Sequence, residues 1–185
     1  MKKPLYQLKQ RHDVIRQFTP NWFTVTMGTG VVALILAEFS VFAQSINMFA
    51  TLLWQMNIVL FSLFSVLYIL RWLIYPHEAR QIFTHSSMAL FLGTIPMGLA
   101  TIINGFLKFG VVLYGDIAIQ IAQMLWYVDV FLAVLIGVFV PFLMFSRQKH
   151  ELKTMTAMWL LPIVACEVTA TSGGLLLQHF AVGQT

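Results

Sequence analysis

The sequence predicts an all-α transmembrane protein with five membrane spans. Of its 185 residues, 59% are hydrophobic and 10% are charged, and the mean hydropathy is +0.81. A soluble domain has about half apolar and about a quarter charged residues. Five apolar stretches are long enough for a transmembrane helix, which needs about 20 residues; they are residues 22–43, 52–74, 86–107, 117–145 and 156–177. Strands of a β-barrel would be shorter and would alternate in polarity.

Composition also excludes several classes of function. The 11 Lys and Arg, against 7 Asp and Glu, are too few for the basic face of a nucleic-acid-binding protein. The single cysteine, Cys166, allows no internal disulfide and no cysteine metal cage. No pair of nucleophile and base stands out, and no ATP-binding loop motif occurs. We therefore predict no enzyme, no catalytic residue, no metal site and no cofactor.

The distribution of basic residues predicts how the spans are oriented, because basic loops stay in the cytoplasm. Residues 1–21 form a polar segment that is too long for the basic region of a signal peptide. Ten basic residues lie on one side of the predicted spans and Lys108 lies on the other; the ten are Lys2, Lys3, Lys9, Arg11, Arg16, Arg71, Arg80, Arg147, Lys149 and Lys153. The sequence thus predicts a cell-membrane protein with a cytoplasmic N-terminus and an external C-terminus, in which residues 22–185 form the transmembrane domain.

Recurring patterns indicate that a helical hairpin is the repeated unit. Three elements recur after 65 to 72 residues: Leu53-Trp54-x-x-Asn57 as Leu125-Trp126-x-x-Asp129, Gly28-Thr29 as Gly93-Thr94, and Pro96 as Pro162. Asp129 lies within a span, at the position of Asn57 in the repeat. We therefore expect Asp129 to make a buried hydrogen bond that holds hairpins together.

Small residues are concentrated in the odd-numbered spans. Windows of 22 residues contain nine Gly, Ala, Ser and Thr in each odd span, but two and three in the even spans. At helical spacing they form stripes: Thr26, Gly30, Ala33, Ala37 and Ser40; Thr94, Gly98, Thr101 and Gly105; and Glu167, Thr171, Gly174 and Gln178. Such stripes let transmembrane helices pack closely, but packing alone does not require the even spans to lack them. We favour an inner layer of odd helices around a polar path, shielded from lipid by the even helices.

Prolines and acids within the spans support a polar path. Pro96 and Pro162 would kink the third and fifth spans, which is tolerated where protein or water satisfies the freed backbone groups. Glu167 lies midway along the fifth span, where a charge costs about 2.5–3.5 kcal/mol. It is a candidate proton-carrying or gating carboxylate, and the alternative is a protonated packing residue. Glu38, near the outer end of the first span, is expected at the membrane interface.

Four segments resemble the tellurite-resistance and C4-dicarboxylate transporter family, which includes plant slow-type anion channels, fungal malate permeases and sulfite efflux pumps. They are FTPNWFTVTMGTGVVAL (18–34), FLGTIPMGLATIINGF (91–106), VPFLMF (140–145) and MWLLPIVACEVTATSGGLL (158–176). The resemblance implies ten helices in five hairpins, with the odd helices bent by Pro or Gly around a central pore. With the stripes, the expected pore-lining or transport residues are Thr26, Gly28, Thr29, Gly30, Gly93, Thr94, Pro96, Gly98, Thr101, Pro162, Glu167, Thr171 and Gly174.

With five of the ten expected helices, the chain resembles the N-terminal half of a family member. The family's gating phenylalanine belongs to a later helix and has no counterpart here. The resemblance implies transport of a small anion by a channel or a proton-coupled carrier, with a C4-dicarboxylate such as malate ahead of sulfite, chloride or nitrate. A second polypeptide or a homo-oligomer would supply the missing helices. The alternative is a non-conducting fragment or assembly subunit that docks on another membrane protein.

Overall fold

Long apolar helices make up most of the chain, as the sequence predicts. The structure is a computed structural model that describes residues 13–41, 43–146 and 156–182. In these residues, five helical stretches are long and apolar enough to cross a membrane: Pro20–Val41, Gln44–Ile74, Leu90–Tyr114, Asp116–Ser146 and Ala157–Phe180. No strand occurs in the described ranges. The prediction of an all-α transmembrane fold with five spans is confirmed.

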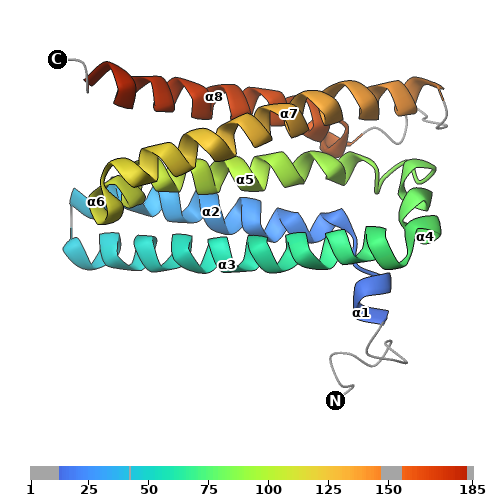
Figure 1. Cartoon of the computed structure of the whole chain (residues 1–185), viewed down its shortest axis with the longest axis horizontal. Helices are drawn as coiled ribbons and strands as arrows, with labels where there is room; N and C mark the ends of the chain where they lie inside the picture. The colour runs from blue at the N-terminus through green and yellow to red at the C-terminus, as the bar shows by residue number, and fades with distance from the viewer. Residues whose placement is uncertain (1–12, 42, 147–155, 183–185) are drawn as a thin grey trace.

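The described ranges contain five long and three short α-helices. The long ones are α2 (Phe23–Glu38), α3 (Gln44–Ile74), α5 (Thr94–Gly105), α7 (Asp116–Ser146) and α8 (Leu161–Val182). The short ones are α1 (Asp13–Arg16), α4 (Pro76–Arg80) and α6 (Val111–Tyr114). A π-helical turn (Phe106–Gly110) joins α5 to α6. As Figure 1 shows, α1 and α4 lie at one end of the bundle and α6 lies at the other.

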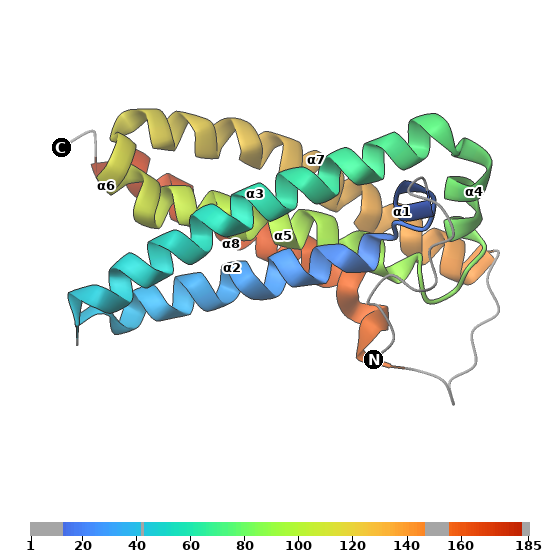
Figure 2. The ribbon, with the colours of Figure 1, turned by 90° about the horizontal axis from the view of Figure 1, so that it is seen from below.

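Helix α5 occupies the centre of the bundle. It runs between the α2–α3 pair on one side and the α7–α8 pair on the other (Figure 1), and α3 crosses over it in the view of Figure 2. In the span that contains α5, 72% of the residues in the most apolar window are buried, against 17–28% in the other four spans. Helix α5 is therefore covered by protein on most of its circumference, whereas its neighbours each keep an uncovered face.

The two sides of α5 pack differently because their side chains differ in size. On the side of α2, a Cβ atom added at Gly98 would lie 2.7 Å from Thr26 Oγ1, so the helices touch where a side chain is missing. On the other side, Leu99 and Ile103 pack with apolar residues of α7 and α8. Small residues allow a close approach of transmembrane helices. The stripe of small residues on α5 therefore positions α2.

Each odd-numbered span begins with a 3₁₀ turn: Pro20–Trp22 before α2, Leu90–Gly93 before α5, and Ala157–Leu160 before α8. Pro96 and Pro162 lie in the first turn of α5 and α8. In the first turn of an α-helix, a missing N–H breaks no intrahelical hydrogen bond. Within the third and fifth spans the prolines therefore mark the change from 3₁₀ to α geometry, and a kink of these spans stays a prediction.

The described basic residues lie at both ends of the bundle. Arg16, Arg71 and Arg80 lie in α1, at the end of α3 and in α4. Lys108 lies in the π-helical turn, towards the opposite end. The other residues behind the orientation prediction are outside the described residues: Lys2, Lys3, Lys9, Arg11, Arg147, Lys149 and Lys153. Which side of the membrane each end faces stays a prediction.

Candidate functional site

Two tryptophans make the same kind of contact in successive hairpins. Trp54 of α3 donates a hydrogen bond from Nε1 to the carbonyl of Ile102 in α5, at 3.3 Å. Trp126 of α7 donates from Nε1 to the carbonyl of Thr169 in α8, at 3.0 Å. In each case an even-numbered span bonds the backbone of the odd-numbered span that follows it. The recurrence in the sequence thus corresponds to a recurring contact in space.

A glycine provides the space for each indole. A Cβ atom at Gly105 would lie 2.1 Å from Nε1 of Trp54, and one at Gly173 would lie 2.7 Å from Cζ2 of Trp126. Real Cβ atoms do not approach ring atoms this closely. Any larger residue would push the indole off the helix, so each glycine and its tryptophan form one packing unit.

A buried polar pair involves the residue three positions after each tryptophan. Asn57 Nδ2 donates to Thr101 Oγ1 at 3.3 Å, and Thr169 Oγ1 donates to Asp129 Oδ2 at 2.7 Å. Asn57 and Asp129 are 0% exposed. The direction of the bond reverses between the two pairs because a hydroxyl can both accept and donate. The expectation that Asp129 makes a buried hydrogen bond between hairpins is confirmed.

Most of the residues expected in the pore lie between helices in the described chain. A Cβ atom at Gly30 would lie 2.0 Å from Thr101 Oγ1, and Thr94 Oγ1 donates to the carbonyl of Pro20 at 3.1 Å. The buried members of the set are Thr26, Gly30, Gly93, Thr94, Pro96, Gly98, Thr101 and Pro162. These residues hold α2, α5 and α8 together here, and a pore-lining role for them stays a prediction.

A second group of the expected residues faces outward. Gly28, Glu167, Thr171 and Gly174 are exposed, and Thr29 is half-buried. Glu167, Thr171 and Gly174 share one face of α8, because residues three and four apart lie above one another on a helix. The Thr171 hydroxyl donates to the carbonyl of Glu167 at 2.9 Å. Among the described ion pairs none involves Glu167.

Arg71 joins the end of α3 to two other segments, a role that could not be predicted from the sequence. Arg71, at the end of α3, is buried. Its guanidinium donates to the carbonyl of Phe18 and reaches the carbonyl of Glu78 at 3.5 Å. The acceptors are backbone carbonyls, which every residue has. The sequence therefore does not distinguish Arg71 from any other arginine beside a loop.

In the described part of the chain, two exposed ion pairs lie at opposite ends of the bundle. Lys108 Nζ lies 2.9 Å from Glu38 Oε1, which joins the π-helical turn to the end of α2. Arg16 Nη2 lies 2.7 Å from Glu78 Oε1, which joins α1 to α4. The hydrogen bond from the Arg16 guanidinium holds the pKa of the Glu78 carboxyl below its ordinary value. Both pairs are solvated, and such pairs add little to stability.

Comparison with known families identifies the bundle. The sequence model described as "voltage-dependent anion channel" matches residues 17–185. The chain belongs to the voltage-dependent anion channel family. The resemblance that the four segments carry is therefore confirmed, and a membrane location follows from the family together with the five apolar helices.

Three proteins to which the chain is similar carry names of transporters. A sulfite efflux pump of Arthroderma otae is 39% identical over 170 residues, which are 91% of this chain and 45% of the pump. A malic acid transport protein of Schizosaccharomyces pombe is 28% identical over 163 residues, 88% of this chain and 36% of that protein. An uncharacterized transporter of Methanocaldococcus jannaschii is 26% identical over 167 residues, which are 90% of this chain and 46% of that transporter.

The chain spans less than half the length of each of these three relatives. No solved structure matches it.

Proposed function

We propose that the chain forms part of a pathway for small anions across a membrane, and that the exposed polar stripe of α8 lies on the wall of that pathway. The observation that carries the proposal is the exposure of Glu167, Thr171 and Gly174 on a membrane-spanning helix. Polar groups at membrane depth are tolerated where protein or water covers them. Membership of an anion channel family supports an anion as the solute.

The outer faces of the even-numbered spans support this assignment by contrast. Leu63, Val66 and Ile69 of α3 are exposed, as are Val134 and Val138 of α7. The transfer of such aliphatic side chains into the hydrocarbon of a bilayer is favourable. Helix α8 also exposes apolar side chains, such as Ile163 and Leu177. Its stripe adds the exposed Glu167 and Thr171, so we propose that the polar path runs along this stripe.

We propose sulfite as the solute, ahead of malate. The similarity to the sulfite efflux pump of Arthroderma otae, at 39% identity, exceeds the similarity to the malic acid transport protein of Schizosaccharomyces pombe, at 28%. This order reverses the expectation from the sequence, which put malate first. Donation from the Thr171 hydroxyl to an oxygen of either anion requires the hydroxyl to leave the carbonyl of Glu167, to which it donates here.

We further propose that the pathway is completed by helices that this chain does not supply, either from a second polypeptide or from further copies. The open face of α8 supports this, as does the coverage of 45% of the Arthroderma otae pump. The same open face would suit an assembly subunit that conducts nothing. Labelling and flux experiments distinguish the two functions.

The first experiment places single cysteines in the Cys166→Ala chain and treats membranes with a membrane-impermeant thiol reagent. We expect Thr171→Cys to react, because the stripe of α8 faces water. Two matched positions should not react: Thr101→Cys, which is 4% exposed, and Val134→Cys, which is 55% exposed but faces lipid. Equal reaction at positions 171 and 134 would contradict a wet path along α8.

The second experiment measures uptake of labelled sulfite, malate, chloride and nitrate into liposomes. The chain is reconstituted alone and after co-expression with the second half of a full-length relative. Sulfite uptake in either arm supports the transport proposal, and uptake that requires the second half supports a two-polypeptide pathway. No uptake of any of the four anions in either arm, with folded protein in the liposomes, would contradict the transport proposal and favour a non-conducting assembly subunit.

A further inference from the structure

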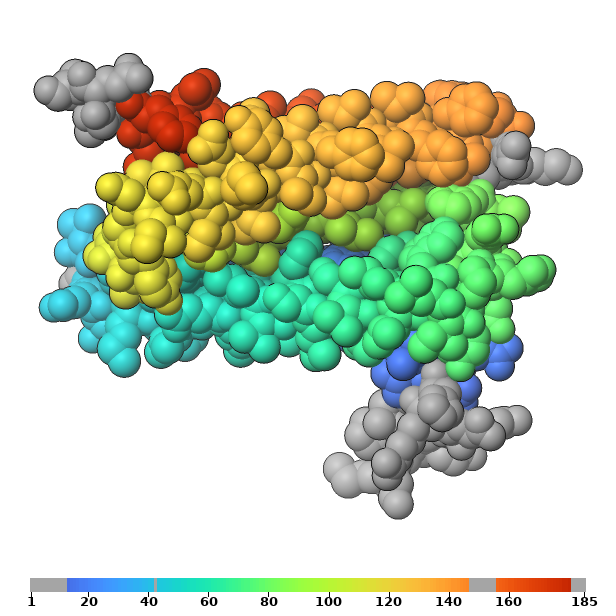
Figure 3. Space-filling view, viewed as in Figure 1, coloured from blue at the N-terminus to red at the C-terminus, as the bar shows by residue number. Residues whose placement is uncertain are grey.

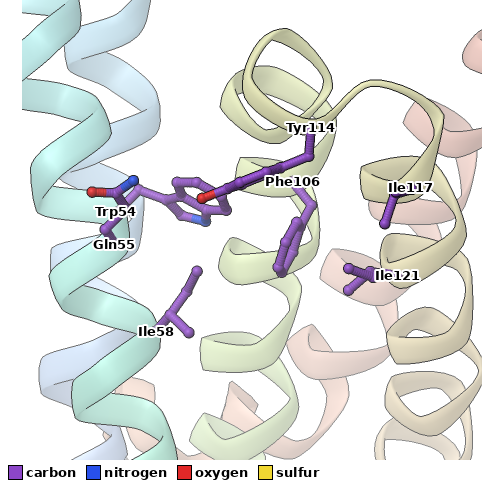
Figure 4. A pocket seen from close by; sticks show the side chains of 7 residues that line it. All are labelled: Trp54, Gln55, Ile58, Phe106, Tyr114, Ile117 and Ile121. Carbon is purple, nitrogen blue, oxygen red and sulfur yellow. The ribbon is translucent and has the colours of Figure 1, made fainter.

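We propose that a groove between α3 and α7 binds the acyl chain of a membrane phospholipid. The groove has a volume of about 450 Å³ and lies beside α6. Ile58 of α3 lies on one wall, Ile117 and Ile121 of α7 lie on the other, and the buried Trp54 lies at the floor. Figure 4 shows these side chains. Phe106, from the π-helical turn, lies between the two walls. This site makes no use of the polar stripe of α8.

The groove opens on the side of the bundle that faces lipid. Figure 3 shows a furrow between α3 and α7 on this face of the molecule. Ile117 is 62% exposed and Ile121 is 39% exposed, so the wall on α7 is continuous with the apolar outer surface of that helix. In a membrane, the hydrocarbon of the bilayer is therefore the medium that reaches the groove.

The floor of the groove is apolar because its one polar atom is already bonded. Trp54 is buried against Gly105, and its Nε1 donates to the carbonyl of Ile102. The rings of Trp54 and Phe106 meet edge to face, with centroids 5.1 Å apart. Water stays in a cavity where it finds two to four polar partners, and this floor offers none. An acyl chain, which is as apolar as a leucine side chain, fits the surface.

Polar groups gather at one end of the groove and set the direction of the lipid. Gln55 and Tyr114 line that end, while Ile58 and Ile121 lie deeper (Figure 4). Within the described part of the chain, neither the Gln55 amide nor the Tyr114 hydroxyl has a hydrogen-bond partner. Tyr114 ends α6, next to the turn at Gly115, and tyrosine is enriched at membrane interfaces. The ester and glycerol oxygens of a phospholipid would lie at this end, with the acyl chain running towards Ile58.

The experiment measures phospholipid that stays bound when the protein is purified from membranes in mild detergent and examined by native mass spectrometry. The Ile121→Trp variant fills the groove with a larger side chain. Val138→Trp is the matched control, because Val138 is on the same helix and exposed but outside the groove. We expect the wild type and Val138→Trp to retain phospholipid, and Ile121→Trp to retain about tenfold less, since at least two methylene groups lose their contacts.

Circular dichroism and gel filtration show whether Ile121→Trp is folded, and Ile58→Phe fills the same groove from α3 if it is not. Equal retention by the wild type and a folded groove-filling variant would overturn the proposal. Absence of phospholipid from the wild type, or retention of a sterol in its place, would also overturn it. Since no step depends on transport, a failed flux assay leaves the lipid site standing, and the reverse holds too.

Discussion

A threonine hydroxyl of α5 and another of α8 each bond a polar side chain from the preceding even-numbered span, although one partner is an amide and the other is an acid. Thr101 accepts from the amide of Asn57, and Thr169 donates to the carboxyl of Asp129. The hydroxyl can take either part because it carries both a proton and lone pairs. The threonine therefore fixes where the contact lies, and its partner can be an amide or an acid.

This equivalence predicts the effect of substitutions at Asp129. Asp129→Asn should keep a hydrogen bond to Thr169 and fold normally, since Asn57 makes the same contact. Asp129→Ala should lower the free energy of unfolding by about 1–3 kcal/mol, because the buried Thr169 hydroxyl loses its partner on α7. Unfolding by denaturant in detergent micelles measures both. A loss of the same size in Asp129→Asn would show that the contact depends on the acid itself.

Glu167 is the acid for which we predict a role in transport. If the carboxylate carries protons or gates the path, Glu167→Gln should change the pH dependence of anion flux in liposomes, because the amide does not titrate. Glu38→Gln is the matched control, since Glu38 lies at the end of α2 and pairs with Lys108 outside the stripe. An unchanged pH profile in folded Glu167→Gln protein would remove the proposed role.

The structural role of Asp129 could be predicted from the sequence, whereas the hydrogen-bond partner of Trp54 could not. The recurrence of Asn57 as Asp129 indicates a shared structural role, because a polar residue at one position of a repeated apolar helix needs a partner. The partner of each tryptophan is a main-chain carbonyl. Every residue has a carbonyl, so no sequence pattern identifies the one that accepts.

At the scale of the helices, small residues serve two purposes that look alike in a sequence. The stripes of α2 and α5 face each other, and Gly30 lies against Thr101. The stripe of α8 at Glu167 and Thr171 is exposed. A stripe can pack against a helix or line a path, and only the positions of the neighbouring helices distinguish the two. Composition could therefore predict that odd spans differ from even ones, without predicting which stripe is buried.

Gly105, which contacts the indole of Trp54, provides a test of helix packing. Gly105→Ala would place a Cβ atom 2.1 Å from the indole, and we expect it to cost about 1–3 kcal/mol of stability through overpacking. Gly28→Ala is the matched control, because a Cβ atom there has nothing within 4 Å. It should be neutral or stabilising by up to about 1 kcal/mol. Thermal unfolding of both variants checks the pair, and equal midpoints would contradict a tight contact at Gly105.

The ion pair that joins α1 to α4 should respond to acid. Because the hydrogen bond from Arg16 lowers the pKa of Glu78, the contact is fully present above the ordinary value of 4.5 and is lost as the pH falls through the lower value of the folded protein. An NMR titration of the Glu78 carboxyl should give a midpoint below 4.5. Arg16→Gln should return the midpoint towards the ordinary value, and a midpoint that is the same with and without Arg16 would show that the pair does not form in solution.

At the scale of the whole molecule, the number of spans could be predicted and their arrangement could not. Length and hydropathy determine which segments cross a membrane, since each needs an apolar stretch of about 20 residues. The central position of α5 depends on glycines and apolar residues that face different neighbours, such as Gly98 against Thr26. These pairings join residues far apart in the chain, and periodicity alone does not indicate which stripes meet.

The orientation of the whole bundle is a prediction of its own. Basic residues gather at the end that carries α1 and α4, so we expect this end in the cytoplasm and the C-terminus outside. Alkaline phosphatase, which is active only outside the cytoplasm, should be active when fused after Thr185 and inactive when fused after Arg80. The opposite pattern of activity would reverse the orientation.

The tryptophan contacts also bear on how the protein is made. Trp54 of α3 bonds a helix that emerges from the ribosome later, and Trp126 of α7 does the same. Each hairpin that has entered the bilayer thus presents an indole N–H to which the backbone of the next helix can bond. The helices can therefore assemble in the order in which they are synthesised.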